Sequence, residues 1–490
     1  SRQSQRTDSV TLALRLQNTG RAAAENVVVT LQPGDGFSIV GETNGEVHLE
    51  RLSAGRSAAV EYTIQPNAAE TARVVCQITW DDRVSQGNSA EFADVVRFLE
   101  AAEGFQRIPN PYIVGHPVRS SEMFYGREDV FRFLAENLSG SVQDRTLVLY
   151  GQRRTGKTSI LYQLLAGRLG EGFIPVLIDM QELAPLINNT GDFLSEVAYQ
   201  LARAVTKAGV TLEAPPEDAF ATAPTRAFNR FLDALEDALP NKRVVVMLDE
   251  FELIETKIAD GKLDTDILGY FRSLIQHRSR LVFIFTGTHR LEEMSHDYWS
   301  ILFNIALYRR VSFLSDTDAV ALLRKPVADT LSVDDLAVEK VVNLTSGHPY
   351  FIQLIAWALV NECNTRQRNY ATINDVNTAV QDILTTGEAH FAYIWQQASG
   401  LERLALAAVA HTLRPGKDWA RPSEILETLA NAGDTRIQQT ILVEALDKLV
   451  AQEVLAVATE GALRYRFQLE VLRLWIEANK SVTALVERNQ

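Results

Sequence analysis

The stretch TLVLYGQRRTGKTSILYQLLAGRL, at residues 146–169, decides the fold class of this 490-residue chain. A short apolar segment at 146–150 is followed by GQRRTGKT at 151–158, which matches the pattern G-x-x-x-x-G-K-[ST]. An amphipathic stretch comes next. A glycine-rich turn between a strand and a helix points successive backbone N–H groups inward, and the helix N-terminus adds the positive end of its dipole. The stretch therefore predicts a phosphate-binding loop.

Each part of this loop has an expected role. Lys157 should reach the β- and γ-phosphates of a nucleotide, and the hydroxyl of Thr158 should ligate Mg²⁺. The side chains of Arg153 and Arg154 receive no role from the pattern. The other residues expected to line the phosphates are Gly151, Arg154, Thr155, Gly156 and Ser159.

A second motif, VVVMLDEFE at 244–252, reads as a buried strand that ends in acidic residues. Asp249 can hold Mg²⁺ through water, and Glu250 can polarise the attacking water. This second acid favours the ATPase side of the P-loop proteins. There, the acidic strand is separated from the P-loop strand by one other strand.

The next strand reads LVFIFTGTHR at 281–290. A polar residue at its end, Thr286, could sense the γ-phosphate or the attacking water, and Arg290 could complete the site. The alternative is that Thr286 only caps a turn.

The remaining pattern predicts a multidomain chain. Between 121 and 315, strands alternate with helices, which indicates a parallel sheet with helices on both faces. Residues 316–386 read as helical throughout and would form a lid. From about 400 come helical patterns, two short strands at 454–457 and 463–467, and a last helix, the order of a winged-helix domain at 387–490.

The N-terminal residues 1–99 are rich in short alternating strands separated by turn signals, as in an all-β sandwich of immunoglobulin type. His48, its only histidine, has no catalytic partner in view. LRLQNTGRAAAENVVVTL at 14–31 and LERLSAGRSAAVEYTI at 49–64 resemble cell-adhesion-related Ig-like modules. That resemblance implies a fold and a protein-interaction role. Residues 100–120 form a linker, whose apolar composition predicts that it packs on the domain that follows.

Taken in order, FYGRE (124–128), GQRRTGKT, VVVMLDEFE, TGTHR, GHPYFIQ (347–353) and YRFQLEVLRLWI (465–476) resemble the STAND class of signalling NTPases. The resemblance is to the archaeal-ATPase-like branch, which is similar to the origin-recognition AAA+ initiators. It implies that His348 and Pro349 contact the β-phosphate or ribose, although Gly-His-Pro is also an ordinary helix start. Residues placed near the base are Tyr125, Arg127, Ile113 and Val114. AAA+ rings use an arginine finger, for which Arg309 and Arg310 are candidates.

Composition narrows the remaining possibilities. Apolar residues make up 46% and charged residues 22% of the chain, as in folded proteins. No run reaches the roughly 18 apolar residues of a membrane span. The net charge of −14 argues against a general nucleic-acid coat. Cys76 and Cys363 lie far apart, which favours a reducing cytoplasm. Because the chain begins at Ser1 rather than methionine, a further segment could precede it.

The predicted winged helix lacks a clear basic face. Its candidate recognition helix, 436–451, offers Arg436 and Lys448 against acidic neighbours, and Arg464 and Arg466 lie on the wing. A DNA reader usually carries a basic face. The pattern therefore favours a domain that moves with the nucleotide state over one that contacts DNA.

The sequence as a whole predicts a slow ATPase switch that uses ATP/ADP and Mg²⁺. In the ATP state it would self-associate, and protein partners would bind through the Ig-like or winged-helix domain. A DNA-handling AAA+ ATPase of initiator or transposition-helper type is the main alternative, and a scaffold that holds a nucleotide structurally is a second.

Overall fold

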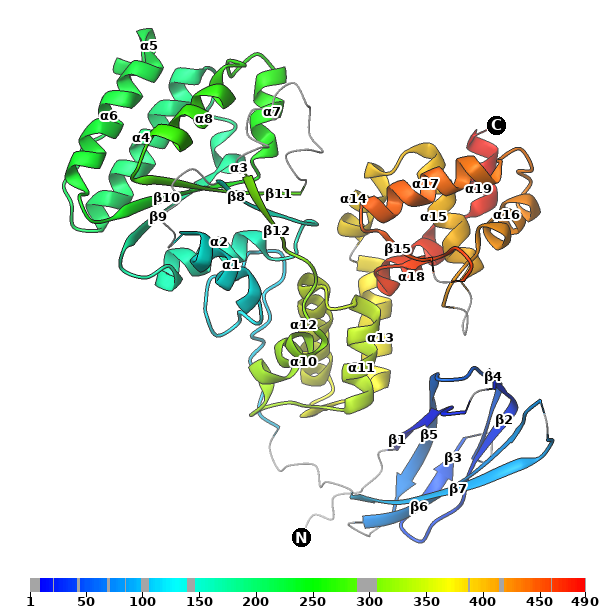
Figure 1. Cartoon of the computed structure of the whole chain (residues 1–490). Helices are drawn as coiled ribbons and strands as arrows, with labels where there is room; N and C mark the ends of the chain where they lie inside the picture. The colour runs from blue at the N-terminus through cyan, green and yellow to red at the C-terminus, as the bar shows by residue number, and fades with distance from the viewer. Residues whose placement is uncertain are drawn as a thin grey trace. The chain divides into compact units, whose positions relative to one another are not determined.

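The computed structural model describes residues 9–20, 22–41, 45–67, 71–83, 85–97, 105–138, 146–288, 306–386, 388–413, 418–459 and 461–489 (Figure 1). Arg290 lies outside these ranges. The chain divides into two compact units, one of Ser1–Asn110, Val327–Leu344 and Ala358–Gln490, and one of Pro111–Pro326 and Thr345–Trp357. The expected limits of the lid, 316 and 386, do not coincide with limits of these units.

The second unit is built on a five-stranded sheet in the order β12-β8-β11-β10-β9, and every neighbouring pair is parallel. The predicted parallel sheet is confirmed. β11 separates the P-loop strand β8 from the acidic strand β10, as the two motifs predict. The strands are β8 (Thr146–Tyr150), β9 (Phe173–Asp179), β10 (Arg243–Asp249), β11 (Leu281–Gly287) and β12 (Ala306–Arg310).

Helices cover both faces of this sheet because side chains alternate along each strand. In β10, Val244, Val246 and Leu248 enter one buried cluster, whereas Val245 and Met247 enter the other. The first cluster packs against α4 (Thr190–Lys207), α6 (Pro224–Ala238) and α8 (Ile267–His277). The second packs against α1 (Glu128–Leu138) and α2 (Lys157–Gln163), which Figure 1 shows on the opposite side.

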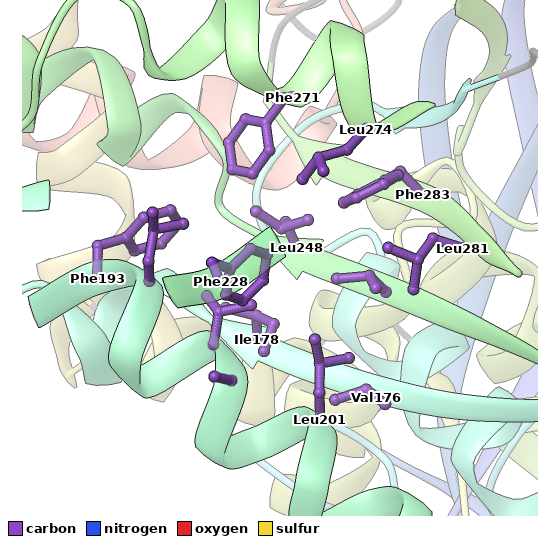
Figure 2. Packing of buried hydrophobic residues seen from close by; sticks show 14 of the residues in the cluster. Val176, Ile178, Phe193, Leu201, Phe228, Leu248, Phe271, Leu274, Leu281 and Phe283 are labelled. Carbon is purple, nitrogen blue, oxygen red and sulfur yellow. The ribbon is translucent and has the colours of Figure 1, made fainter. Parts of the chain in front are cut away.

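Aromatic side chains fill the larger cluster. Figure 2 shows Phe271 and Phe283 from α8 and β11 near Leu248, with Phe193 and Phe228 contributed by α4 and α6. The rings of Phe193 and Phe271 meet edge-on, with centroids 6.0 Å apart. This aromatic layer buries one face of β10 and β11. Short helices join the main elements: α3 (Met180–Leu183), α5 (Ala219–Thr222) and α7 (Glu252–Ala259), with a π-helical turn at Leu164–Arg168.

The N-terminal strands form two antiparallel sheets that share one buried core, which includes Val29, Phe37, Tyr62 and Val74. The hydroxyl of Tyr62 donates to the carbonyl of Val29 at 2.7 Å, so its polar end is satisfied inside this core. The Ig-like assignment stays a prediction. One sheet has β1 (Val10–Gln17), β5 (Ser57–Pro66) and β3 (Phe37–Val40); the other has β4 (Glu46–Leu52), β2 (Ala24–Leu31), β6 (Thr71–Asp81) and β7 (Asn88–Arg97).

The predicted all-helical lid region contains an exception. Strands β13 (Ser332–Val333) and β14 (Tyr370–Ala371) form a short parallel pair. Two-residue strands give no period that a sequence pattern can reveal, so this prediction was wrong locally. The helices here are α10 (Asp316–Arg324), a 3₁₀ turn at Lys325–Val327, α11 (Asp335–Thr345), α12 (Pro349–Thr365) and α13 (Ile373–Thr386).

The C-terminal region has the predicted order of helices followed by a two-stranded hairpin, but it ends in two helices where one was expected. Gln439 begins the candidate recognition helix, three residues later than expected. The winged-helix assignment stays a prediction. The elements are α14 (Glu388–Gln397), α15 (Gly400–Thr412), α16 (Pro422–Asn431), α17 (Gln439–Ala451), β15 (Leu455–Ala458), β16 (Arg464–Phe467), α18 (Glu470–Asn479) and α19 (Val482–Asn489). Among the described residues, no helix combines the length and apolar character that crossing a membrane requires.

Candidate active site

The sequence motifs meet at the carboxyl ends of β8, β11 and β10. Thr286 of β11 lies in register with Asp249 of β10, and Gly287 lies in register with Tyr150, the residue before the P-loop. Because these strands are parallel, their carboxyl ends lie at one edge of the sheet. Ligands of open α/β sheets bind at this edge.

The P-loop needs its glycines for different reasons. Gly151 has φ 154°, and a Cβ there would lie 2.4 Å from the carbonyl oxygen of Val311. Gly156 has φ 99°, a left-handed backbone that suits glycine, and it leads directly into α2. Arg154 also adopts a left-handed backbone, with φ 64°. Tight conformations at these positions bend the loop back toward the helix N-terminus.

Lys157 is the best-enclosed cation of this loop, with 8% of its surface exposed. Its ammonium donates to the carbonyl oxygens of Gly151 and Gln152 at 2.7 and 2.8 Å. Burial lowers the pKa of Lys157 to about 8, while the carboxylates of Glu252, Asp249 and Glu250 act in the opposite direction. The ammonium therefore lies inside the loop and close to acidic side chains.

Asp249 joins the two motifs. One of its carboxylate oxygens accepts a hydrogen bond from Thr158 at 2.5 Å, and the other accepts one from the hydroxyl of Thr286. Burial raises the pKa of Asp249, and these two hydrogen bonds oppose that shift. A hydroxyl and a carboxylate in contact are oxygen ligands of the kind that Mg²⁺ prefers. The oxygen atoms of Thr158 and Asp249 thus fit the predicted Mg²⁺. The side chain of Thr286 is fully buried and faces Asp249.

Glu250, the residue after Asp249, has a different backbone conformation and a different partner. Its backbone is left-handed, with φ 53°, and its carboxylate lies 3.8 Å from the guanidinium of Arg153 in the P-loop. Burial raises the pKa of Glu250, and the charge of Arg153 lowers it. The sequence pattern gave Arg153 no role, and only the structure reveals this ion pair.

The residues assigned to the base lie on the segment that precedes α1. Arg127 is buried and donates to the carbonyl oxygen of Thr155 in the P-loop at 2.7 Å. Burial lowers its pKa to about 10. Tyr125 is half-buried, and the backbone N–H of Ile113 donates to the side chain of Gln353 at 3.1 Å. Arg127 therefore braces the P-loop directly, and base contacts by Tyr125, Ile113 and Val114 stay predictions.

Ser159 has a partner that the loop pattern does not indicate. Its hydroxyl accepts a hydrogen bond from the backbone N–H of Val118 at 2.9 Å. Val118 is buried, and the nearby guanidinium of Arg119 lies over the ring of Tyr162 in α2, 4.6 Å from its centroid. The side chain of Ser159 thus holds the preceding segment against α2, and its contact with a phosphate stays a prediction.

The Gly-His-Pro turn lies where α12 begins. Gly347 has φ 82°, and a Cβ there would lie 2.3 Å from the carbonyl oxygen of Leu314. His348 is buried between the rings of Phe313 and Phe351, whose centroids are 4.9 and 5.0 Å from its own. Pro349 is the first residue of α12, as the helix-start interpretation predicts. Contact of His348 and Pro349 with a nucleotide stays a prediction.

This turn is linked to the P-loop. The guanidinium of Arg154 lies over the ring of Tyr350, 4.2 Å from its centroid. A cation above an aromatic face is attracted by the ring quadrupole. The side chain of Arg154 therefore contacts α12, where the sequence pattern assigned it no role.

Of the two arginine-finger candidates, Arg309 forms an ion pair with Asp129 of α1 within its own chain. Both side chains are partly exposed, at 38% and 59%. Arg310 is exposed at the end of β12. A role in trans stays a prediction for both.

Glu252 is the acidic residue that the sequence analysis missed. It begins α7, and one of its oxygens accepts hydrogen bonds from the backbone N–H and the hydroxyl of Thr288 at 3.2 and 3.0 Å. The signal was present in the letters DEFE, where the second glutamate follows Asp249 by three positions.

Comparisons with known proteins agree with this geometry. Residues 141–295 match the family model described as AAA domain. The chain contains an AAA-type P-loop NTPase domain. A comparison with curated proteins gave no match.

Solved structures resemble the chain beyond the AAA-type domain. A Walker-type ATPase of Pyrococcus abyssi is 19% identical, with a TM-score of 0.54 over 74% of this chain and 98% of that one. The ORC2 protein of Aeropyrum pernix, in ADPNP and ADP complexes, is 15% identical, with a TM-score of 0.49 over 78% and 97%. The ORC1 protein of the same organism, in complex with DNA, is 18% identical, with a TM-score of 0.37 over 75% and 95%. The similarity to the Walker-type ATPase shows a shared fold. The similarities to the two ORC proteins have TM-scores below 0.5 and assign no function.

Proposed function

We propose that this chain binds ATP and hydrolyses it to ADP and phosphate at the edge where the P-loop meets β10. The contact that carries the proposal is the 2.5 Å hydrogen bond between Thr158 and Asp249. It brings together the two motifs that P-loop ATPases use to hold a metal-bound triphosphate. The match of residues 141–295 to the AAA domain model supports the same activity.

Binding would rest on the loop and its brace. The backbone N–H groups at the start of α2 point to the phosphates, and the ammonium of Lys157 neutralises their charge. Arg127 stiffens the loop through the carbonyl of Thr155, so less of the loop has to be ordered when ATP binds. Thr158 and Asp249 would hold Mg²⁺, which shields the phosphate charge once bound.

Hydrolysis would use Glu250 as the acceptor for a proton of the attacking water. Burial keeps this carboxylate more basic than an exposed one, and Arg153 keeps its charge compensated. The water oxygen forms a bond to the γ-phosphorus, and the bond to the β–γ bridging oxygen breaks. Its electron pair leaves with ADP.

Two uses of this ATPase stay open, and the AAA-type match fits the DNA-handling alternative at least as well as the STAND switch. One local observation favours a DNA contact. Arg464 and Arg466 of β16 both lie over the ring of Trp419, 5.7 and 4.7 Å from its centroid. Guanidinium groups on a hairpin are suited to phosphate contacts. Against this stands the scarcity of cations in α17, where Lys448 is the only one.

One set of measurements tests these proposals. Phosphate release from ATP by the purified 490-residue chain should require Mg²⁺, and absence of turnover with Mg²⁺ present would overturn the ATPase proposal. Duplex DNA binding, followed by fluorescence anisotropy, should weaken between about 50 and 200 mM salt if phosphates are contacted. Arg466→Ala should reduce this binding, whereas Arg488→Ala, an exposed arginine of α19, should not. Failure to bind at the lower salt would reject DNA handling and leave the switch.

The proposal of a nucleotide-dependent switch predicts a separate result. Self-association should appear in light scattering when ATP is bound and should disappear with ADP. A chain that keeps the same mass with either nucleotide would contradict the switch without affecting the ATPase proposal.

A further inference from the structure

Two neighbouring arginines of the P-loop have different partners. The guanidinium of Arg154 lies over the ring of Tyr350, at the start of α12. The guanidinium of Arg153 lies 3.8 Å from the carboxylate of Glu250, the residue that follows β10. Of these two cations, Arg153 therefore faces the acid that is proposed to take a proton from the attacking water.

The ion pair between Arg153 and Glu250 is loosely held. Its separation of 3.8 Å exceeds the length of a hydrogen bond, and the two side chains are 42% and 31% exposed. Ion pairs in contact with solvent contribute little to stability, because water competes for both charges. Both groups are therefore accessible to a ligand, and a stronger partner can replace either of them at small cost.

The backbone holds Glu250 in place independently of Arg153. Its φ of 53° is left-handed, a conformation that at residues other than glycine is found mostly at active sites and switch regions. Its N–H donates to the carboxylate of Asp249 at 3.2 Å, and its carbonyl accepts from the N–H of Leu253 at 3.0 Å. Glu250 should therefore stay at this edge of the sheet when Arg153 moves away.

The position of Glu250 indicates which phosphate Arg153 can reach. In the proposed hydrolysis, the water attacks the γ-phosphorus in line with the bond to the β–γ bridging oxygen. A carboxylate that takes a proton from this water lies beyond the γ-phosphate, where ADP has no atoms. Because the guanidinium of Arg153 lies beside this carboxylate, the γ-phosphate is the group within its reach.

We propose that Arg153 distinguishes ATP from ADP by exchanging Glu250 for the γ-phosphate. This inference rests on the proposed ATPase function. Without a γ-phosphate, the guanidinium stays with Glu250 and compensates its charge. When ATP binds, the guanidinium forms charge-assisted hydrogen bonds with the γ-phosphate, which are stronger than an exposed ion pair. The exchange leaves the carboxylate of Glu250 open to the attacking water, and the ion pair forms again after phosphate has left.

The first test compares the affinities of the 490-residue chain for ADP and for a non-hydrolysable ATP analogue. Arg153→Ala should weaken binding of the analogue about tenfold, because hydrogen bonds between charged groups are lost, and should change ADP affinity less than about twofold. Arg154→Ala removes the same charge from the same loop and should change both affinities by a similar factor. An Arg153→Ala chain that binds both nucleotides equally less well, or both as well as wild type, would overturn the inference.

A second test asks whether Glu250 and the phosphate compete for Arg153. Glu250→Gln removes the competing charge, so the analogue should bind about two- to fivefold more tightly, as expected from the strength of an exposed ion pair. Relief of repulsion between Glu250 and the phosphates would persist in the Arg153→Ala background, whereas a gain from the exchange should be lost there. A gain of equal size in that background, or no gain with Arg153 present, would overturn the exchange.

Failure of the proposed function would give different results. A wild-type chain that binds neither nucleotide would reject the nucleotide site and this inference with it. A wild-type chain that binds both nucleotides but releases no phosphate would reject the ATPase and the role of Glu250 in it. In that case the two affinities would still decide whether Arg153 contacts the γ-phosphate.

Discussion

The hydroxyl of Thr158 and the carboxylate of Asp249, 91 positions apart in sequence, are joined by a hydrogen bond of 2.5 Å. This contact connects the first turn of α2 to the end of β10. The contact depends on the sheet order, because β11 alone separates β8, the strand before the P-loop, from β10. Any change that shifts β11 should therefore alter the relation between phosphate loop and acid.

Replacing Asp249 by asparagine should weaken Mg²⁺-dependent nucleotide binding most. The amide keeps the shape but loses the charge that orients metal-bound water, for which losses of about 10–100-fold in metal affinity are typical. Titration of Mg²⁺ against nucleotide affinity measures the effect. Unchanged Mg²⁺ dependence would remove Asp249 from the metal site, and Asp260→Asn, an exposed residue after α7, serves as the control.

Lys157→Ala should lower ATP affinity by at least about tenfold, because hydrogen bonds to charged groups contribute about 1.5–3 kcal/mol. Equilibrium binding of a fluorescent ATP analogue measures this loss. Lys207→Ala, at the exposed end of α4, should bind as wild type does. Affinity that is retained in Lys157→Ala would refute the P-loop assignment.

Glu250→Gln should separate binding from hydrolysis. Glutamine keeps the volume but cannot take a proton, so turnover should fall roughly 10²–10⁴-fold while ATP still binds. Single-turnover phosphate release and nucleotide binding are both needed. Glu171→Gln, on an exposed turn before β9, is the matched control. Turnover near the wild-type rate would transfer the role to another group.

Two glycines offer opposite stability effects. Gly347→Ala should destabilise the fold by more than about 1 kcal/mol, since φ 82° is left-handed and a Cβ would lie 2.3 Å from the carbonyl of Leu314. Gly269→Ala, within α8 with no atom near the added Cβ, should stabilise by about 0.5–1 kcal/mol. Chemical denaturation measures both. A stable Gly347→Ala chain would show that the turn before α12 can be rebuilt.

Some features of the fold could be predicted because a single segment of the sequence contains all the information that they need. The bounds of β8 were predicted without error, since an apolar run stops at a glycine loop. The position of β11 between β8 and β10 also followed from the motif order. These features depend on local sequence patterns and on the phosphate- and metal-binding motifs.

Other features depend on partners that are distant in sequence. The sequence indicates a polar residue at Thr286 but not that it turns to Asp249, because register decides this. Arg153 was left without a role because its partner Glu250 is 97 positions away in the sequence. Glu252 was overlooked because its partner, Thr288, lies 36 positions further on, just after β11.

The division of the chain into compact units has a consequence for synthesis. The unit that holds the ATPase site includes Pro111–Pro326 and, after a segment of the other unit, Thr345–Trp357. A ribosome delivers the P-loop long before Gly347 and the start of α12. Until these residues emerge, Leu314 lacks the carbonyl of Gly347 as a partner, and Arg154 lacks the ring of Tyr350. A nascent chain stopped near residue 326 should therefore be more open to proteases than one that extends past residue 357.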